Sequence, residues 1–167
     1  MWECVKYLAF IGIIGFFIGR LIPKAWMQWD KRPFRIYDFE EDGQVYNCLK
    51  IRAWQDKIPD MSKLFTKWMP PKKLPKHLSE EAITLMLQET CIAELIHAFL
   101  CIFGIYSAVI WSCWGGVIVA VLYFIGNLPF ILVQRYNRPK LRKLLQRIRE
   151  RTYIPVTKDE ECKVCES

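Results

Sequence analysis

The stretch from Ala98 to Val133 constrains the fold most strongly, because its 36 residues include no charged side chain. A single helix of that length would measure about 54 Å, whereas the hydrocarbon core of a bilayer is only about 30 Å thick. The stretch therefore predicts two membrane crossings that form a helical hairpin. The tandem glycine Gly115-Gly116 marks the expected turn between them.

A further apolar run near the N-terminus is long enough for a third crossing. Residues 5–22 would form a helix of about 27 Å. The charged residues of this run, Lys6 and Arg20, lie near its ends and can extend toward water. A cleaved signal peptide is the alternative, but no small-x-small cleavage motif follows. The three predicted crossings are thus residues 5–22, 91–113 and 117–134.

The net charge of +7 is concentrated after the last crossing, where residues 134–151 hold eight Lys or Arg and a single acid. A basic segment next to an apolar run is typical of a membrane surface, so we do not expect nucleic acid as a partner. The first crossing is also followed by basic residues: Lys24, Lys31, Arg32 and Arg35. The positive-inside rule then predicts a multi-pass cell-membrane protein with its N-terminus outside and its C-terminus in the cytoplasm.

The fold class that follows is an all-α integral membrane protein in one membrane domain, residues 1–167. Residues 23–89 form a cytoplasmic interfacial segment, in which the alternating residues 35–49 predict either a short β-hairpin or an irregular loop. Ser79 is a typical N-cap for a helix that could run unbroken into the second crossing. Residues 135–151 predict a basic amphipathic helix, either against lipid or packed on its own domain, and residues 152–167 a polar tail.

Glu89, Glu94 and His97 are the sharpest candidates for chemistry. Glu94 and His97 are three residues apart and share one helix face, and Glu89 could reach the same pocket from its edge. Ionisable groups at membrane depth are costly and usually functional. A carboxylate that orients an imidazole suits a general base. The alternatives are a structural Glu–His pair, or a metal site assisted by Asp56, Asp60 or a second subunit. A helix that stays in the headgroup layer until Leu95 would instead keep Glu94 outside the hydrocarbon core.

Two basic groups are candidates for binding an anionic ligand. Lys50 and Arg52 would lie on one side of a strand, which suits a phosphate or carboxylate. Arg135 and Arg138 close the third crossing at the depth of Glu94 and His97, so membrane topology would bring them together. The alternatives are a headgroup-binding surface for the first group and plain lipid anchoring for the second.

Three blocks of this sequence resemble the glycosyl-4,4'-diaponeurosporenoate acyltransferases, small membrane enzymes of Gram-positive bacteria. The blocks are Lys50-x-Arg52-x-Trp54-x-Asp56-x-x-Pro59-Asp60, then Glu89 with Ala93-Glu94-x-x-His97, and finally Asn127-x-Pro129 with Gln134-Arg135-Tyr136-Asn137-Arg138-Pro139. Together they cover roughly residues 48–142. That family is assigned the last step of staphyloxanthin synthesis, in which a fatty acyl group is esterified onto a glucose 6-hydroxyl.

The resemblance implies a membrane acyltransferase that moves a fatty acyl group from an activated donor to a hydroxyl of a glycosylated lipid. It implies catalytic roles for His97, Glu94 and Glu89. The substrate-binding residues would be Lys50, Arg52, Trp54, Asp56, Asn127, Arg135, Asn137 and Arg138. We expect no metal and no cofactor, because an acyl-CoA or another acyl thioester enters as donor substrate. Membrane lipids are expected partners, and self-association into a homo-oligomer stays open.

Two other functions remain open at this point. A non-catalytic lipid-binding or scaffold protein would use the cations to hold anionic lipid and the Glu–His pair as a helix clamp. A metal-dependent membrane enzyme would use Glu89, Glu94, His97 and Asp56 as ligands. The pair Cys162-x-x-Cys165 has no partner pair for a zinc site, so no role follows from it.

Overall fold

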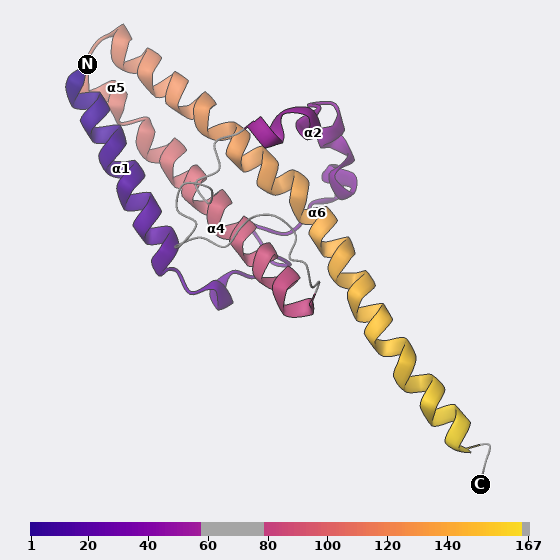
Figure 1. Cartoon of the computed structure of the whole chain (residues 1–167). Coiled ribbons are helices and arrows are strands. Elements are labelled where there is room, and N and C mark those ends of the chain that lie inside the picture. The colour runs from indigo at the N-terminus through magenta and orange to yellow at the C-terminus, as the bar shows by residue number, and fades with distance from the viewer. Residues whose placement is uncertain (58–78, 165–167) are drawn as a thin grey trace.

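The computed structural model describes residues 1–57 and 79–164, and within these ranges it contains helices and no strand. Three helices are long: α1 (Trp2–Leu21), α4 (Glu80–Gly104) and α6 (Trp114–Val164). The short helices are η1 (Lys24–Trp26), η2 (Asp38–Asn47), α2 (Ile51–Trp54), η3 (Gln55–Lys57) and α5 (Ser107–Ile110). Figure 1 shows α1, α4 and the first half of α6 side by side, with the rest of α6 extending well beyond the other two.

Three helical stretches are long and apolar enough to cross a membrane, as predicted. They are Trp2–Leu21, Glu80–Ile110 and Trp114–Arg151. Many of their aliphatic and aromatic side chains are exposed, which suits contact with lipid tails rather than with water. Trp2, Trp26 and Trp114 are 67–83% exposed at the ends of the spans, where indole rings favour the membrane–water interface. The chain is therefore a membrane protein.

The turn of the helical hairpin lies slightly earlier than predicted. The chain reverses over Trp111–Cys113, so that Gly115 and Gly116 lie in the first turn of α6 and not in the turn itself. A Cβ atom on Gly116 would collide with the carbonyl oxygen of Trp111 and would lie 2.9 Å from that of Ser107. The glycine is therefore needed for close packing of α6 against α5, and not for an unusual backbone conformation.

Helix α1 packs on α4 through small residues. A Cβ atom on Gly15 would contact the side chain of Ile96 at 3.4 Å, and one on Gly19 would collide with it. Glycines four residues apart lie on one helix face and let two membrane helices approach closely. Near the other end of α1, the hydroxyl of Tyr7 donates a hydrogen bond to the carbonyl oxygen of Phe103 at 2.9 Å.

The basic amphipathic helix predicted for residues 135–151 is a direct continuation of the third crossing. Its apolar face packs on its own domain: Leu141 and Leu145 form a buried cluster with Ile83 and Leu87 of α4. The N-terminal turns of α4 and this part of α6 thus extend the hairpin past the apolar region. Of the two alternatives, packing on the protein is the one observed.

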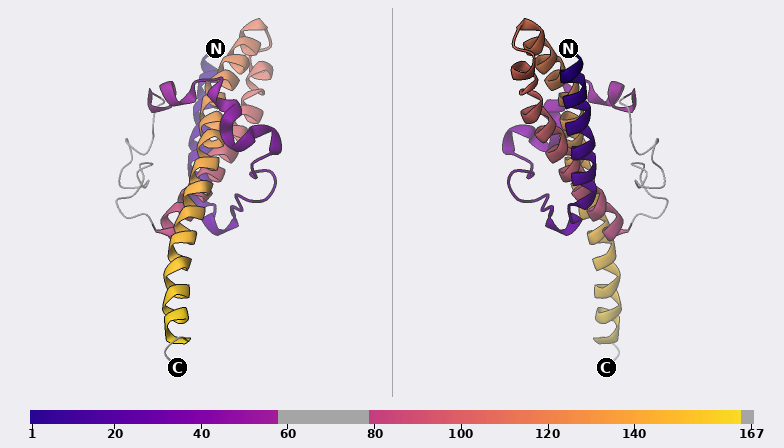
Figure 2. Two further views of the ribbon diagram at one scale, coloured as in Figure 1. Left: turned by 90° about the vertical axis from the view of Figure 1, so that its right-hand side faces the viewer. Right: turned by 90° about the vertical axis from the view of Figure 1, so that its left-hand side faces the viewer.

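The β-hairpin interpretation of residues 35–49 is wrong, because most of this segment, Asp38–Asn47, forms the 3-10 helix η2. The Glu40 carboxylate accepts a hydrogen bond from the backbone N–H of Tyr37 at 2.8 Å, which caps the helix at its start. Local side-chain to backbone bonding of this kind competes with strand pairing. Helices η2 and α2 lie against α6 on the side away from α1 (Figures 1 and 2).

Candidate active site

A buried ionic cluster joins α4 to α6 where the apolar part of the hairpin ends. The Glu94 carboxylate, on α4, accepts hydrogen bonds from two arginines one turn apart on α6. Arg135 Nε lies 2.8 Å from Oε1, and Arg138 Nη2 lies 2.6 Å from Oε2. The i, i+3 spacing places both guanidinium groups on one helix face. The predicted meeting of Glu94 with these two cations is therefore present in the structure.

The guanidinium of Arg138 is only 1% exposed, and each of its nitrogens has an acceptor. Besides Glu94, Nε donates to the Thr90 hydroxyl at 3.1 Å, and Nη1 donates to the carbonyl oxygen of Phe34 at 2.7 Å. A buried charge is tolerated when it is paired and hydrogen-bonded in this way. Arg138 thus links α6 both to α4 and to the segment that follows α1.

Arg135 binds a second carboxylate, Glu40, which the sequence had not indicated. Its Nη1 lies 3.3 Å from Glu40 Oε1, and its Nη2 donates to the carbonyl oxygen of Pro33 at 3.0 Å. The Tyr46 hydroxyl donates to the same Glu40 oxygen at 2.5 Å. Burial, and next this hydrogen bond, raise the pKa of Tyr46 well above its usual range. Sequence spacing carries no signal for a pair 95 residues apart, and Glu40 resembles any acid in a polar segment.

His97 lies one turn beyond Glu94 on α4 and contacts α6 at a different point. Its Nδ1 atom is 2.9 Å from Oδ1 of Asn127, and its ring stacks on Phe130 with 4.3 Å between the ring centroids and 11° between the planes. The Asn127 amide nitrogen donates to the carbonyl oxygen of Tyr123 at 2.8 Å, which fixes the amide orientation. Oδ1 therefore faces the imidazole, and because an amide oxygen only accepts, this contact favours a proton on Nδ1.

The three predicted catalytic residues, Glu89, Glu94 and His97, thus each contact a different set of partners. The two carboxylate oxygens of Glu94 face Arg135 and Arg138, and the contact at His97 Nδ1 comes from Asn127. The Glu89 carboxylate forms an ion pair with Lys24 at 2.5 Å, and both side chains are about one-third exposed. Among the described residues, no group of three or more His, Cys, Asp or Glu side chains is placed to hold a metal ion.

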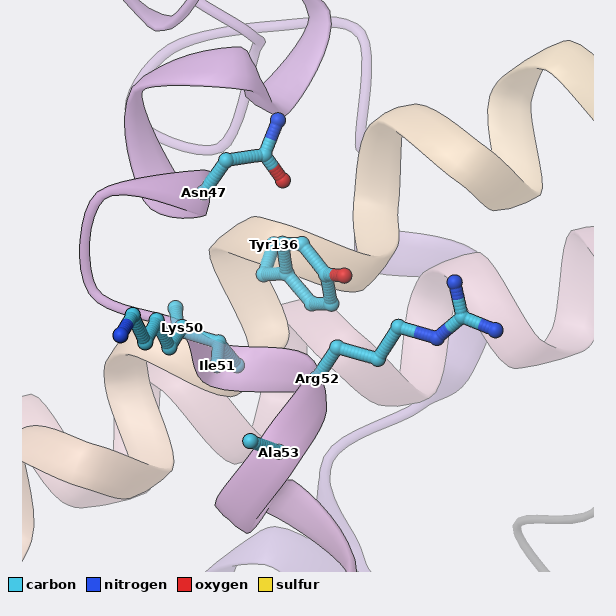
Figure 3. A pocket seen from close by; sticks show the side chains of 6 residues that line it. All are labelled: Asn47, Lys50, Ile51, Arg52, Ala53 and Tyr136. Carbon is cyan, nitrogen blue, oxygen red and sulfur yellow. The ribbon is translucent and has the colours of Figure 1, made fainter.

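The Lys50–Asp60 block lies partly within the described chain, where it lines an open pocket of about 550 Å³. The lining residues are Asn47, Lys50, Ile51, Arg52, Ala53 and Tyr136 (Figure 3). Lys50 and Arg52 lie at the start of a helix and not on a strand, so they do not share a face as predicted. Figure 3 shows their charged ends pointing away from each other, on opposite sides of Tyr136.

Of the remaining predicted substrate-binding residues, Trp54 and Asn137 can be placed in the structure and the side chain of Asp56 cannot. Trp54 packs against the buried cluster of Tyr46, Ile51 and Tyr136, and its indole N–H donates to the carbonyl oxygen of Leu49 at 2.9 Å. Asn137 is partly buried on α6, between the two arginines. The side chains of Asp56 and Cys162, and the residues Pro59, Asp60 and Cys165, lie outside the described part of the chain.

The fold and the site together define a helical membrane protein with a histidine and a buried ionic cluster between two of its spans. The sequence model of the glycosyl-4,4'-diaponeurosporenoate acyltransferase family matches residues 23–147. A curated protein of that name from Staphylococcus aureus (strain MRSA252) is 32% identical over 138 residues, which are 80% of this chain and 81% of the relative. Its counterpart from strain N315 is 30% identical with the same coverage. No solved structure matches the chain.

The chain therefore belongs to the glycosyl-4,4'-diaponeurosporenoate acyltransferase family, and it is a membrane acyltransferase. This confirms the resemblance drawn from its three sequence blocks. The match begins at residue 23, directly after α1, and ends at residue 147 on α6. It thus includes the ionic cluster, His97 with Asn127, and the pocket beside Tyr136.

Proposed function

We propose that this protein transfers a fatty acyl group from an acyl thioester to a hydroxyl of a glycosylated, carotenoid-like lipid. The relatives are named for a glycosylated carotenoid acid, which supplies the acceptor class. The position of His97 supports a lipid-borne acceptor. The residue lies 14 positions before Trp111, so it is about 20 Å from the hairpin turn in a bilayer core about 30 Å thick.

His97 acts as the general base in this proposal, and its contact with Asn127 is the observation that carries it. With Nδ1–H held by Asn127, the basic Nε2 can accept the proton of the acceptor hydroxyl as its oxygen attacks the thioester carbonyl. A C–O bond forms and the C–S bond breaks. The proton passes from His97 to the departing thiolate, so no covalent acyl-enzyme and no cofactor are required.

The donor phosphates bind in the pocket lined by Lys50 and Arg52. This pocket abuts α6 at Tyr136, next to the arginines of the ionic cluster. Coenzyme A carries a diphosphate and a separate 3'-phosphate, which suits two cations on opposite sides of one pocket. The N–H groups of Arg135 and Arg138 already have protein acceptors. In the proposal these two arginines act through Glu94 and the interfacial segment, as positioning residues.

The membrane orientation follows from the distribution of basic residues. The ionic cluster, the pocket and the basic half of α6 all lie at the end of the bundle away from the hairpin turn. The positive-inside rule assigns this end to the cytoplasm and the N-terminus to the outside. Acyl thioesters are cytoplasmic metabolites, so this orientation places the pocket on the side where the donor is available.

The direct test is His97→Gln in the full-length protein, purified and returned to lipid nanodiscs. Labelled acyl-CoA and a glycosylated carotenoid acid are supplied, and the new ester is resolved by chromatography. We expect a loss of about 10²-fold or more in kcat for His97→Gln, since general-base catalysis contributes rate factors of this size. The control is Ser112→Ala, which removes an exposed hydroxyl in the hairpin turn, far from His97. Near-normal transfer by His97→Gln would end the assignment of the base.

A further inference from the structure

The segment between α1 and α4 contributes a buried carboxylate that the proposed reaction does not use. Glu40 is only 2% exposed. It accepts hydrogen bonds from the backbone N–H of Tyr37 at 2.8 Å and from the Tyr46 hydroxyl at 2.5 Å. Burial of a carboxylate costs free energy unless charge and hydrogen bonds compensate for it. The compensation here comes from this same segment and from one arginine of α6.

That arginine, Arg135, is shared between two carboxylates on different elements. Its Nε binds Glu94 of α4 at 2.8 Å, and its Nη1 lies 3.3 Å from Glu40 of η2. The same Nη1 donates to the carbonyl oxygen of Arg35 at 3.3 Å. A planar guanidinium with fixed donor directions sets the position of every group that it binds. Arg135 therefore fixes the position of η2 relative to α4 and α6.

The Tyr46 side chain connects η2 to the pocket. Its ring is buried with Ile51 and Tyr136, and both of those residues also line the pocket. Lys50 directly precedes Ile51 and has a left-handed backbone conformation, with a φ of 48°, which turns the chain from η2 into α2. A shift of the Tyr46 ring would therefore move the pocket floor and the cation beside it.

We propose that Glu40 and Tyr46 are positioning residues that hold the pocket of Lys50 and Arg52 in place for the phosphate groups of the acyl donor. The inference rests on the proposed function, because it assigns these two residues to the donor site of that reaction. Neither residue touches the reacting atoms. They act through Tyr136 and Ile51 on one side and through Arg135 on the other.

The test compares two donors in the full-length protein in nanodiscs, acyl-CoA and S-acyl-pantetheine, which lacks the nucleotide phosphates. We expect Glu40→Gln and Tyr46→Phe to raise KM for acyl-CoA about tenfold, while kcat stays within about twofold. KM for S-acyl-pantetheine should not change. Glu40→Asp should recover part of the affinity. The matched control is Tyr7→Phe, which removes a phenol hydroxyl that donates to the carbonyl oxygen of Phe103 on the side of the hairpin turn, away from the pocket.

The positioning role would be overturned if KM rose equally for acyl-CoA and S-acyl-pantetheine, or if kcat fell while KM stayed unchanged. If Glu40→Gln does not fold, Tyr46→Phe decides the question, because it removes a single hydroxyl. Calorimetric binding of an unreactive CoA thioether separates this inference from the proposed function. Wild-type protein that binds the thioether but forms no ester contradicts the reaction, and the variants are then compared by Kd alone. Wild-type protein that does not bind the thioether overturns the donor pocket and this inference with it.

Discussion

Arg138 reaches across the α4–α6 interface to Glu94, with 2.6 Å between Nη2 and Oε2, and its own side chain is 1% exposed. The pair lies where the apolar hairpin meets its polar extension, so it ties the membrane-embedded half of the protein to the half outside. Removing Arg138 would leave two buried carboxylates, Glu94 and Glu40, to share the single cation of Arg135, so one buried negative charge would be uncompensated. The remaining partners of Arg138, Thr90 and the carbonyl oxygen of Phe34, would lose their donors as well.

Arg138→Met should therefore lower the free energy of unfolding by about 3–5 kcal/mol, the usual cost of breaking a buried pair. Arg149→Met should cost less than about 1 kcal/mol, because its ion pair with Glu80 is roughly half exposed. Denaturant titration of the purified protein in detergent measures both values. If both variants lost the same free energy of unfolding, the ion pair of Arg138 with Glu94 would have to be solvated in the native protein.

The two glycines Gly116 and Gly126 of α6 should respond in opposite ways to alanine. A Cβ atom on Gly116 would collide with the Trp111 carbonyl, so Gly116→Ala should destabilise by about 1–3 kcal/mol. Around Gly126, apart from its own helical turn, the described chain has no atom within 4 Å of such a Cβ. Gly126→Ala should be neutral or stabilise by up to about 1 kcal/mol, through helix propensity. Thermal unfolding in one detergent compares them, and a stable Gly116→Ala variant would contradict the close packing at the turn.

Hydropathy was sufficient to predict the three spans, because the bilayer forces each apolar run of this length into a helix. The start of α4 was also predictable, since Ser79 accepts a hydrogen bond from the backbone N–H of Ala82 at 3.2 Å, as an N-cap does. The turn of the hairpin was placed a few residues too late. Tandem glycine indicates backbone freedom, but Gly116 instead provides room for a neighbouring backbone, and sequence alone does not distinguish the two.

The site was predictable only where membrane topology determines proximity. The hairpin topology places Glu94 and Arg138 at the same end of the two helices, away from the turn, and their contact followed from that topology. His97 and Asn127 each lie 14 residues from the turn at Trp111–Cys113, but their contact was not predicted, because helix rotation decides which side chains face each other. Glu40 could not be found, because its partner on α6 depends on how a non-membrane segment folds back. Residues 35–49 have the alternating pattern of a strand, yet the described part of the chain offers no strand for them to pair with.

The Tyr46 phenol should remain protonated at pH values where ordinary tyrosines ionise. Its pKa is raised, first by burial and then by its hydrogen bond to Glu40. A group whose pKa is higher in the folded protein adds stability below its ordinary value, near 10, and this stability is lost as the pH rises through the raised value. The wild-type protein and Tyr46→Phe are titrated by ultraviolet absorbance, and the difference between the two curves reports the ionisation of this one phenol. A difference transition centred near pH 10 would contradict the buried hydrogen bond.

Asn127 should matter to the rate of acyl transfer because it selects the tautomer of His97. Asn127→Leu removes the acceptor at 2.9 Å from Nδ1, so the proton can reside on either nitrogen and the ring loses its orientation. We expect kcat to fall about ten- to hundredfold, a part of the full contribution of a general base, with KM for the acyl donor little changed. Asn127→Asp keeps an acceptor oxygen and should retain more activity than Asn127→Leu. Steady-state ester formation in nanodiscs measures all three proteins, and full activity of Asn127→Leu would show that this contact does not serve the reaction.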